Sequence, residues 1–199
     1  MTETPNPNIV DADSLTGEMH PIRRVVVALG SNLGERLSSL QGAVDALADT
    51  PDFFVTGVSP VYETEPVDSP EDSGPYLNAV VLADTTLPAA RLMERALAIE
   101  DAYERERSEV RNAPRTLDVD LIVVGDRRSN EDFLRLPHPR AHERAFVLQP
   151  WYDLEPDAVF PERGPIADLL DAVDGSGVKR REDLTLDRSE EHTSELQSH

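Results

Sequence analysis

Residues 114–124 read PRTLDVDLIVV, an alternating ribbon that predicts a strand and carries two acids. Because successive side chains of a strand point to opposite sides, Asp118 and Asp120 are expected on one side together with Ile122 and Val124. The other side is expected to be apolar and to consist of Leu117, Val119, Leu121 and Val123. Two neighbouring carboxylates on an apolar strand repel each other unless a cation compensates them, and Mg²⁺ prefers carboxylate and phosphate oxygens. The alternative is a solvated strand end, which a bare D-x-D pattern also fits.

Basic residues surround this ribbon in an otherwise acidic chain. The net charge is −20, with 19 basic and 39 acidic residues, yet basic residues slightly outnumber acidic ones between Arg105 and Arg144. Nearly all of them are arginines, whose planar guanidinium suits phosphate oxygens. The acid pair together with Arg105, Arg107, Arg111 and Arg115 therefore suggests a cradle for a polyphosphate, although an ordinary solvated surface of mixed charge fits the composition equally well.

Composition excludes several classes of protein. The absence of cysteine rules out disulfides, thiolate zinc sites and cysteine nucleophiles, and the charge of −20 argues against a nucleic-acid partner. The chain has no apolar run near the ~20 residues that a membrane span requires and no leader-like start. We therefore expect a cytoplasmic protein with no membrane association.

Apolar periodicity predicts the elements of one domain. The expected order is strand 25–29, helix 35–49, strand 53–62, strand 76–84, helix 88–107 and strand 117–124. Pro60 suggests an edge position or a bulge, and the proline-rich and acidic segment 63–75 is expected to be a mobile loop. This order predicts an α+β fold with a ferredoxin-like βαββαβ core, a mainly antiparallel sheet and helices on one face. One face of the sheet is then left for a ligand.

The regions outside this core are expected to differ in order. Residues 1–23 are predicted to be a disordered tail, 24–175 the domain, and 176–199 a second disordered tail. A C-terminal extension follows Gly125, with a buried run at Ala145–Leu148 and a final helix near Ile166–Val173. The last residues, 188–199, read RSEEHTSELQSH and look like translated read-through of a sequencing adapter, so they are excluded from the fold prediction.

Three further patterns point to ligand contacts. The turn Gly30–Gly34 joins a strand to a helix but lacks the lysine and spacing of a P-loop, and a plain tight turn explains it equally well. His138 and Arg144 belong to a turn rich in proline and arginine, which suits phosphate. Tyr76 and Asn78 share one side of a strand, and an aromatic face beside a carboxamide suits a flat heterocycle, although a strand tyrosine usually serves packing.

Taken together, these segments resemble the bacterial 6-hydroxymethyl-7,8-dihydropterin pyrophosphokinases of folate biosynthesis. The motifs that carry the resemblance span about residues 25–161 and are ALGSNLG at 28–34, SPVYETEPV at 59–67, PYLNAVV at 75–81, APRTLDVDLI at 113–122 and LPHPRAHERAFVLQP at 136–150. The resemblance implies transfer of pyrophosphate from ATP to the hydroxymethyl oxygen of the pterin, with attack at the β-phosphorus and release of AMP. It also implies two Mg²⁺ ions as cofactor.

The resemblance further assigns residues to roles. Asp118 and Asp120 would hold both Mg²⁺ ions, and Arg105 and Arg115 would steady the triphosphate and the transition-state charge. The residues expected at ATP are Glu100, Arg107, Arg111, Ile122, His138 and Arg144. The residues expected at the pterin are Gly30, Thr64, Val67, Tyr76, Asn78 and Phe146, with the Tyr76 and Phe146 rings on its two faces and Asn78 at its edge.

Two loops, 63–75 and 104–114, correspond to the mobile loops that close over the substrates in this family. The chain departs from the family pattern at Glu104, at Asn112-Ala113 in place of Trp-Gly, and at Pro139 in place of an aromatic residue. A monomer that acts on ATP and the pterin is expected. The alternatives are a non-catalytic, small-molecule-binding regulatory module on the same scaffold and, more weakly, an RNA-binding domain.

Overall fold

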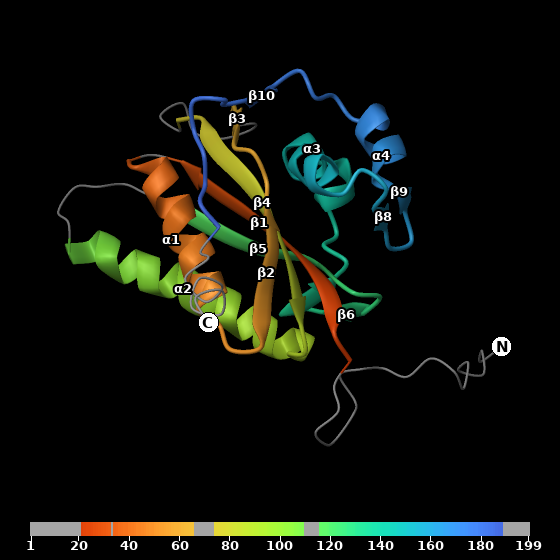
Figure 1. Ribbon diagram of the computed structural model, residues 1–199, viewed down its shortest axis with the longest axis horizontal. Coiled ribbons are helices and arrows are strands. Elements are labelled where there is room, and N and C mark those ends of the chain that lie inside the picture. Colours follow the sequence, from red (N-terminus) through yellow and green to blue (C-terminus); the bar gives the residue numbers. More distant parts are fainter. Residues whose placement is uncertain (1–20, 33, 66–73, 110–115, 189–199) are drawn as a thin grey trace, which may run out of the picture.

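A six-stranded antiparallel sheet forms the centre of the molecule (Figure 1). The computed structural model describes residues 21–32, 34–65, 74–109 and 116–188, with backbone alone for 105–109 and 116. The strand order is β10-β3-β4-β1-β5, and β2 also pairs with β4. The bounds are β1 Arg23–Asn32, β2 Phe53–Val58, β3 Tyr62–Thr64, β4 Tyr76–Thr85, β5 Thr116–Val124 and β10 Val178–Arg180. The predicted antiparallel sheet is therefore confirmed.

The two helices of the predicted core, α1 (Arg36–Ala48) and α2 (Ala89–Glu109), pack on one face of this sheet. Leu40 of α1 and Leu92 of α2 belong to their apolar stripes and join Val81 of β4 in one buried cluster, so the βαββαβ order is confirmed. The predicted strand 53–62 is divided into β2 and β3, and the break follows Ser59, which still donates its backbone N–H to the oxygen of Val80 at 2.9 Å. Pro60 has no N–H to donate to a ladder, which explains the break.

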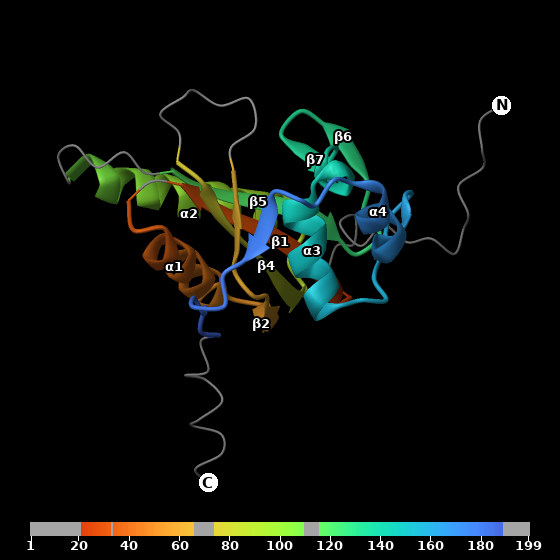
Figure 2. The same cartoon turned by 90° about the horizontal axis from the view of Figure 1, so that it is seen from above.

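The opposite face is partly covered by the C-terminal extension (Figure 2). Its helix α3 (Ala145–Leu154) packs on β4, where Leu148 and Trp151 join Val26 and Val80 in a second apolar cluster. The predicted buried run at 145–148 is thus the first turn of a helix that continues through Pro150. Only the part of this face that α3 leaves uncovered can accept a ligand.

The remaining elements of the extension are short. They are β6 (Ser129–Glu131), β7 (Leu134–Leu136), the 3₁₀ turn η2 (Ala141–Glu143), β8 (Val159–Phe160), β9 (Gly164–Pro165) and α4 (Ile166–Ala172). The predicted final helix is α4. Among the helices in the described ranges, none combines the length and the apolar character needed to cross a membrane.

A β-bulge at Ile122 changes the predicted alternation of β5. In the pairing with β1, Val26 faces Val123 but Val27 faces Leu121, so Ile122 is the extra residue. As a result Ile122 and Val123 both belong to the second apolar cluster, whereas Val124 joins the core under the helices. The predicted sides of Val123 and Val124 were therefore wrong. The bulge follows the acid pair, so it does not affect which side the two aspartates take.

The structure describes the chain beyond residue 175 as far as residue 188, within the segment that the sequence predicted to be a disordered tail. We call residues 174–188 the C-terminal strap. Its strand β10 pairs with β3, and Leu184 and Leu186 pack against the helix-side core. Gln41 of α1 exchanges two 2.8 Å hydrogen bonds with the backbone of Asp187. These contacts join residues that are far apart in the sequence, so local periodicity could not predict them.

Candidate active site

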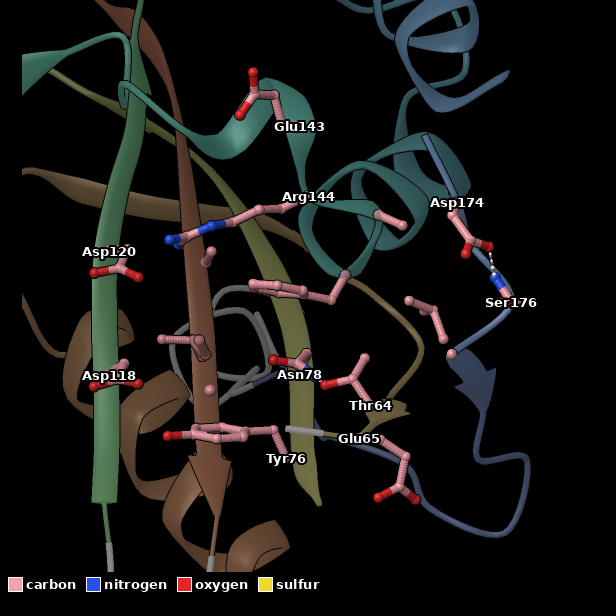
Figure 3. Close-up of a pocket in the computed structure, with 17 residues that line it drawn as sticks. Thr64, Glu65, Tyr76, Asn78, Asp118, Asp120, Glu143, Arg144, Asp174 and Ser176 are labelled. Atoms are coloured by element: carbon pink, nitrogen blue, oxygen red, sulfur yellow. Dashed lines mark hydrogen bonds between the residues drawn. The ribbon is translucent and has the colours of Figure 1, made fainter. Parts of the chain in front are cut away.

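The uncovered part of the second face forms a pocket of about 690 Å³ (Figure 3). Its floor is the sheet, and its walls come from the start of α3 and from the C-terminal strap. Eight residues predicted from the sequence line it together: Gly30, Thr64, Tyr76, Asn78, Asp118, Asp120, Arg144 and Phe146. Segments separated by more than a hundred residues are thus assembled around one cavity.

The acid pair lies on the β5 side of the pocket. The strand pairing sets Asp118 opposite Gly30 and Asp120 opposite Ala28, so both carboxylates stand beside small residues. A Cβ atom at Gly30 would lie 4.0 Å from Asp118 Oδ2 and 3.4 Å from Asn78 Oδ1, so the missing side chain leaves room between the two polar groups. Asp118 is open to the pocket and Asp120 is half-buried.

Electrostatics make this pair unfavourable on its own. Desolvation in the pocket wall raises the pKa of Asp118, and the neighbouring charge of Asp120 raises it further. Desolvation likewise raises the pKa of Asp120, while the guanidinium of Arg144, which extends toward it, lowers the pKa of both acids (Figure 3). The site therefore favours binding of additional positive charge.

Glu100 adds a third carboxyl group next to the pair. It lies on α2, and burial raises its pKa to about 7, with repulsion by Asp118 and then Asp120 adding to the effect. The backbone N–H of Val119 acts in the opposite direction. Glu100 does not line the pocket, so the structure places it beside the acids rather than inside the cavity.

The other end of the pocket is aromatic and carries an amide. Asn78 is only 4% exposed and donates from Nδ2 to Thr64 Oγ1 at 2.8 Å. Tyr76 lies two residues earlier on the same side of β4, and Phe146 comes from the first turn of α3. The guanidinium carbon of Arg144 lies 5.6 Å from the centre of the Phe146 ring. This end can accept a flat ring whose edge hydrogen-bonds.

Besides Glu100, two further predicted site residues lie outside this pocket. His138 lines a neighbouring cavity of about 430 Å³, where its Nδ1 accepts a hydrogen bond from the backbone of Arg140 at 3.2 Å. Burial lowers the pKa of His138, and Arg144 and then Arg140 lower it further, so its ring is neutral near pH 7. The side chain of Ile122 is buried in the second apolar cluster, and its carbonyl accepts from the backbone N–H of His138 at 2.8 Å.

Other predictions cannot be placed. Val67, Arg111 and Arg115 lie outside the described residues, and so do residues 66–73 of the first predicted loop and 110–114 of the second. The first residues of the second loop, 104–109, belong to α2, so this loop begins later than expected. Arg105 and Arg107 belong to the last turns of α2, but their side chains lie outside the description as well. At the start of the first loop, Glu63 and Thr64 belong to β3, so this loop begins later than expected.

Sequence reasoning missed the wall that the strap supplies. The pocket is also lined by Glu65, Glu143, Asp174, Ser176, Gly177 and Val178. Asp174 Oδ1 accepts the backbone N–H of Ser176 at 3.0 Å and shapes a tight turn there. The residues Gly175-Ser176-Gly177 do signal a turn, but nothing local indicates which part of the sheet it will meet.

Comparison with known proteins supports a common origin for most of the chain. A family model described as 7,8-dihydro-6-hydroxymethylpterin-pyrophosphokinase matches residues 26–156. The 2-amino-4-hydroxy-6-hydroxymethyldihydropteridine pyrophosphokinase of Pseudomonas aeruginosa is 38% identical over 159 residues, which are 80% of this chain and 97% of that protein. The protein of the same name from Mycobacterium tuberculosis is 40% identical over an alignment of 160 positions that covers 74% of this chain and 82% of that one.

A solved structure shares the fold. The wild-type HPPK-DHPS of Plasmodium falciparum, crystallised with pteroate, superposes with a TM-score of 0.54 and 14% identity. The match covers 79% of this chain but only 43% of that longer one. Fold and sequence thus define a pyrophosphokinase. The chain belongs to the 7,8-dihydro-6-hydroxymethylpterin-pyrophosphokinase family, as the resemblance of its motifs implied.

Proposed function

We propose that this chain transfers the pyrophosphoryl group of ATP to 6-hydroxymethyl-7,8-dihydropterin in folate biosynthesis. The hydroxymethyl oxygen attacks the β-phosphorus and gives up its proton, the bond from that phosphorus to the α–β bridging oxygen breaks, and AMP leaves. Family membership supports the reaction. The observation that carries the assignment to this site is that one pocket joins an acid pair to an aromatic, amide-bearing slot.

The slot suits the pterin. Asn78 donates a hydrogen bond from Nδ2 to Thr64. Its Oδ1 faces the space left by Gly30, where this oxygen can accept a hydrogen bond from an N–H at the edge of the pterin ring. Tyr76 and Phe146 offer their rings to the two faces of the pterin. Gly30 and Thr64 supply backbone contacts in this proposal, and so does Val67, which lies outside the described residues.

The acid pair suits magnesium. Asp118 and Asp120 are hard oxygen donors whose pKa values are raised mainly by desolvation, and a bound cation would favour their charged forms. Within the described part of the chain, no three His, Cys, Asp or Glu side chains are arranged to hold an ion. Ions at the pair would therefore complete their coordination with water and phosphate, as Mg²⁺ commonly does. We propose two Mg²⁺ ions here, which when bound would neutralise charge on the triphosphate.

Cationic residues complete the proposed ATP site. Arg144 lies between the acid pair and Phe146, where it can contact phosphate. The other groups proposed at ATP or its phosphates are Arg105, Arg107, Arg111, Arg115, Glu100, Ile122 and His138. Because the side chain of Ile122 is buried, any contact from it would use its backbone. All of these groups belong to one chain, so we propose a monomer that acts on two small molecules in the cytoplasm.

The test is formation of AMP from ATP and Mg²⁺ that depends on 6-hydroxymethyl-7,8-dihydropterin. Asp120→Ala is expected to lower this rate by at least about 10³-fold, because it removes half of the proposed metal site. Asp126→Ala is the matched control, since Asp126 is exposed in the turn just after β5 and is expected to have no effect. If folded wild-type protein forms no pterin-dependent AMP, the regulatory module becomes the better assignment.

A further inference from the structure

Beside the aromatic end of the pocket, one carboxylate joins three parts of the chain that are far apart in sequence. Glu63 of β3 accepts, through Oε2, a 2.8 Å hydrogen bond from Arg36 at the start of α1 and another of 2.8 Å from Arg181 in the C-terminal strap. The side chains are largely buried, with exposed fractions of 24% for Arg36, 27% for Glu63 and 31% for Arg181. We call these three residues the Glu63 cluster.

The cluster also reaches the beginning of β4. Arg36 donates from the same Nη1 atom to the backbone oxygen of Pro75 at 2.9 Å. Glu63 directly precedes Thr64, and Pro75 directly precedes Tyr76; Thr64 and Tyr76 face each other in the β3–β4 ladder and both line the pocket. A single guanidinium thus ties together the two strand ends that carry one wall of the pterin slot.

The strap anchors the cluster from the other side. Val178 pairs with Thr64 in the β10–β3 ladder and lines the pocket as well. Arg181 donates its backbone N–H to the oxygen of Val61 at 2.8 Å, and its guanidinium holds Asp183 with bonds of 2.9 and 2.8 Å. Arg181, the partner of Glu63, is therefore itself held in place by its hydrogen bonds to Val61 and Asp183.

We propose that Arg36, Glu63 and Arg181 are positioning residues for the pterin end of the pocket, an inference that rests on the proposed function. None of the three lines the pocket, so they act through Thr64 and Tyr76. The slot depends on the 2.8 Å bond from Asn78 to Thr64 Oγ1, which orients a buried amide. A small shift of β3 would lengthen this bond and turn the acceptor oxygen of Asn78 away from the ring edge.

The charge balance makes Glu63 the critical member. Two guanidinium groups bond the same oxygen atom, so removal of Glu63 leaves Arg36 without a carboxylate partner among the described residues and Arg181 with Asp183 alone, and the two neighbouring cations then repel each other. Isolated surface pairs contribute little, but a shared carboxylate with a backbone carbonyl forms a network. Loss of Glu63 is therefore expected to move β3, β4 and the strap relative to one another.

The experiment is steady-state kinetics of Glu63→Ala, with Glu63→Gln as a milder variant. For Glu63→Ala the KM for the pterin is expected to rise about five- to tenfold while kcat and the KM for ATP stay within about twofold, the pattern of lost substrate binding. A second readout needs no turnover: calorimetric titration of 6-hydroxymethylpterin in the presence of Mg²⁺ and α,β-methylene-ATP is expected to show the same fold-increase in Kd. Thermal melts establish that each variant is folded at the assay temperature.

Further variants separate positioning from general stability. Arg36→Met is expected to resemble Glu63→Ala, whereas Arg181→Met is expected to be milder because the bonds of Arg36 remain. Asp84→Ala is the control, since it removes a 3.0 Å ion pair with Arg24 at the far end of β4 and is expected to leave the pterin KM unchanged.

The outcomes separate the two proposals. If the wild type is active and Glu63→Ala behaves like Asp84→Ala, or if the KM values for ATP and pterin rise together, the positioning role is wrong. If the wild type forms no AMP, the proposed function fails. In that case the calorimetric titration alone tests the positioning role. That role is wrong if Glu63→Ala leaves the Kd for the pterin unchanged, or if the wild type does not bind the pterin.

Discussion

At the scale of single residues, the site gathers carboxyl groups that folding has partly removed from water. Desolvation raises the pKa of Asp118 and Asp120, and desolvation followed by the repulsion of these two acids raises that of Glu100 to about 7. Groups arranged in this way destabilise the protein until positive charge is supplied. Such clusters are typical of binding sites, because a site selected only for stability would not retain them.

Because of Glu100, the loss of folding stability caused by these carboxyl groups depends on pH. Its folded-state pKa of about 7 lies above the ordinary value of 4.5, so the folded protein holds the proton more tightly than the unfolded chain does. Stability from this group is fully present below pH 4.5 and is lost as the pH rises to about 7. In metal-free protein, Glu100→Gln is expected to raise the Tm at pH 8 by about 2–4 °C and to have little effect at pH 4.5, solvent screening at this half-exposed position keeping the change modest.

The measurement is a pair of thermal melts in a chelator at the two pH values. Glu94→Gln on the same helix is the control, because Glu94 is exposed and is expected to show no pH-dependent difference from wild type. An equal change in Tm at both pH values for Glu100→Gln would mean that the carboxyl is not shifted as described.

At the scale of elements, the C-terminal strap completes both the sheet and the pocket. It adds β10 to β3, buries Leu186 to 7% exposure and supplies Val178 to the pocket wall. The strap contributes to stability because it buries apolar side chains, and to binding because it places Val178 in the pocket wall. Truncations at different residues of the strap can test these two contributions.

Two truncations test the strap. A chain that ends after Arg188 is expected to keep the Tm and pterin KM of the full chain, because β10, Leu184 and Leu186 are all present. A chain that ends after Gly177 loses them, and its Tm is expected to fall by about 10 °C, since each buried leucine contributes about 2–5 kcal/mol. Thermal melts and kinetics check both chains. A stable chain ending at Gly177 with an unchanged pterin KM would show that the strap is dispensable.

At the scale of the whole molecule, a net charge of −20 on 199 residues means that the folded state repels itself. Salt screens such repulsion over about 10 Å at 0.1 M, whereas the exposed ion pairs that salt also weakens contribute little. Raising NaCl from about 0.05 to 0.5 M is therefore expected to raise the Tm by about 3–5 °C. Melts in NaCl and in KCl should agree if screening is the cause.

Magnesium is expected to stabilise beyond this screening. At equal ionic strength MgCl₂ should raise the Tm further than NaCl, because an ion that binds only the folded protein shifts the unfolding equilibrium. Asp120→Ala should remove this excess and leave the NaCl effect in place. A Tm that falls with NaCl would indicate that the ion pairs outweigh the repulsion.

The chain by itself determined the core elements and eight of the 17 residues that line the pocket. Periods of 3.6 and 2 located both core helices and the strands, because those patterns arise from burial of one face of a local element. The alternation around Asp118 and Asp120 placed both acids on one side of β5, and Tyr76 and Asn78 on one side of β4, and all four residues line the pocket. The motifs around these residues also identified the family.

Only the tertiary structure shows how the predicted elements assemble into the complete sheet and pocket. The bulge at Ile122, the packing of α3 on the second face, and the strap that supplies Val178 depend on partners far away in the sequence. The Glu63 cluster is of the same kind, since Arg36 and Arg181 meet only after the sheet has formed. Local sequence patterns indicate which side of a helix or strand is buried. Which other element packs against that side depends on the packing of the whole chain.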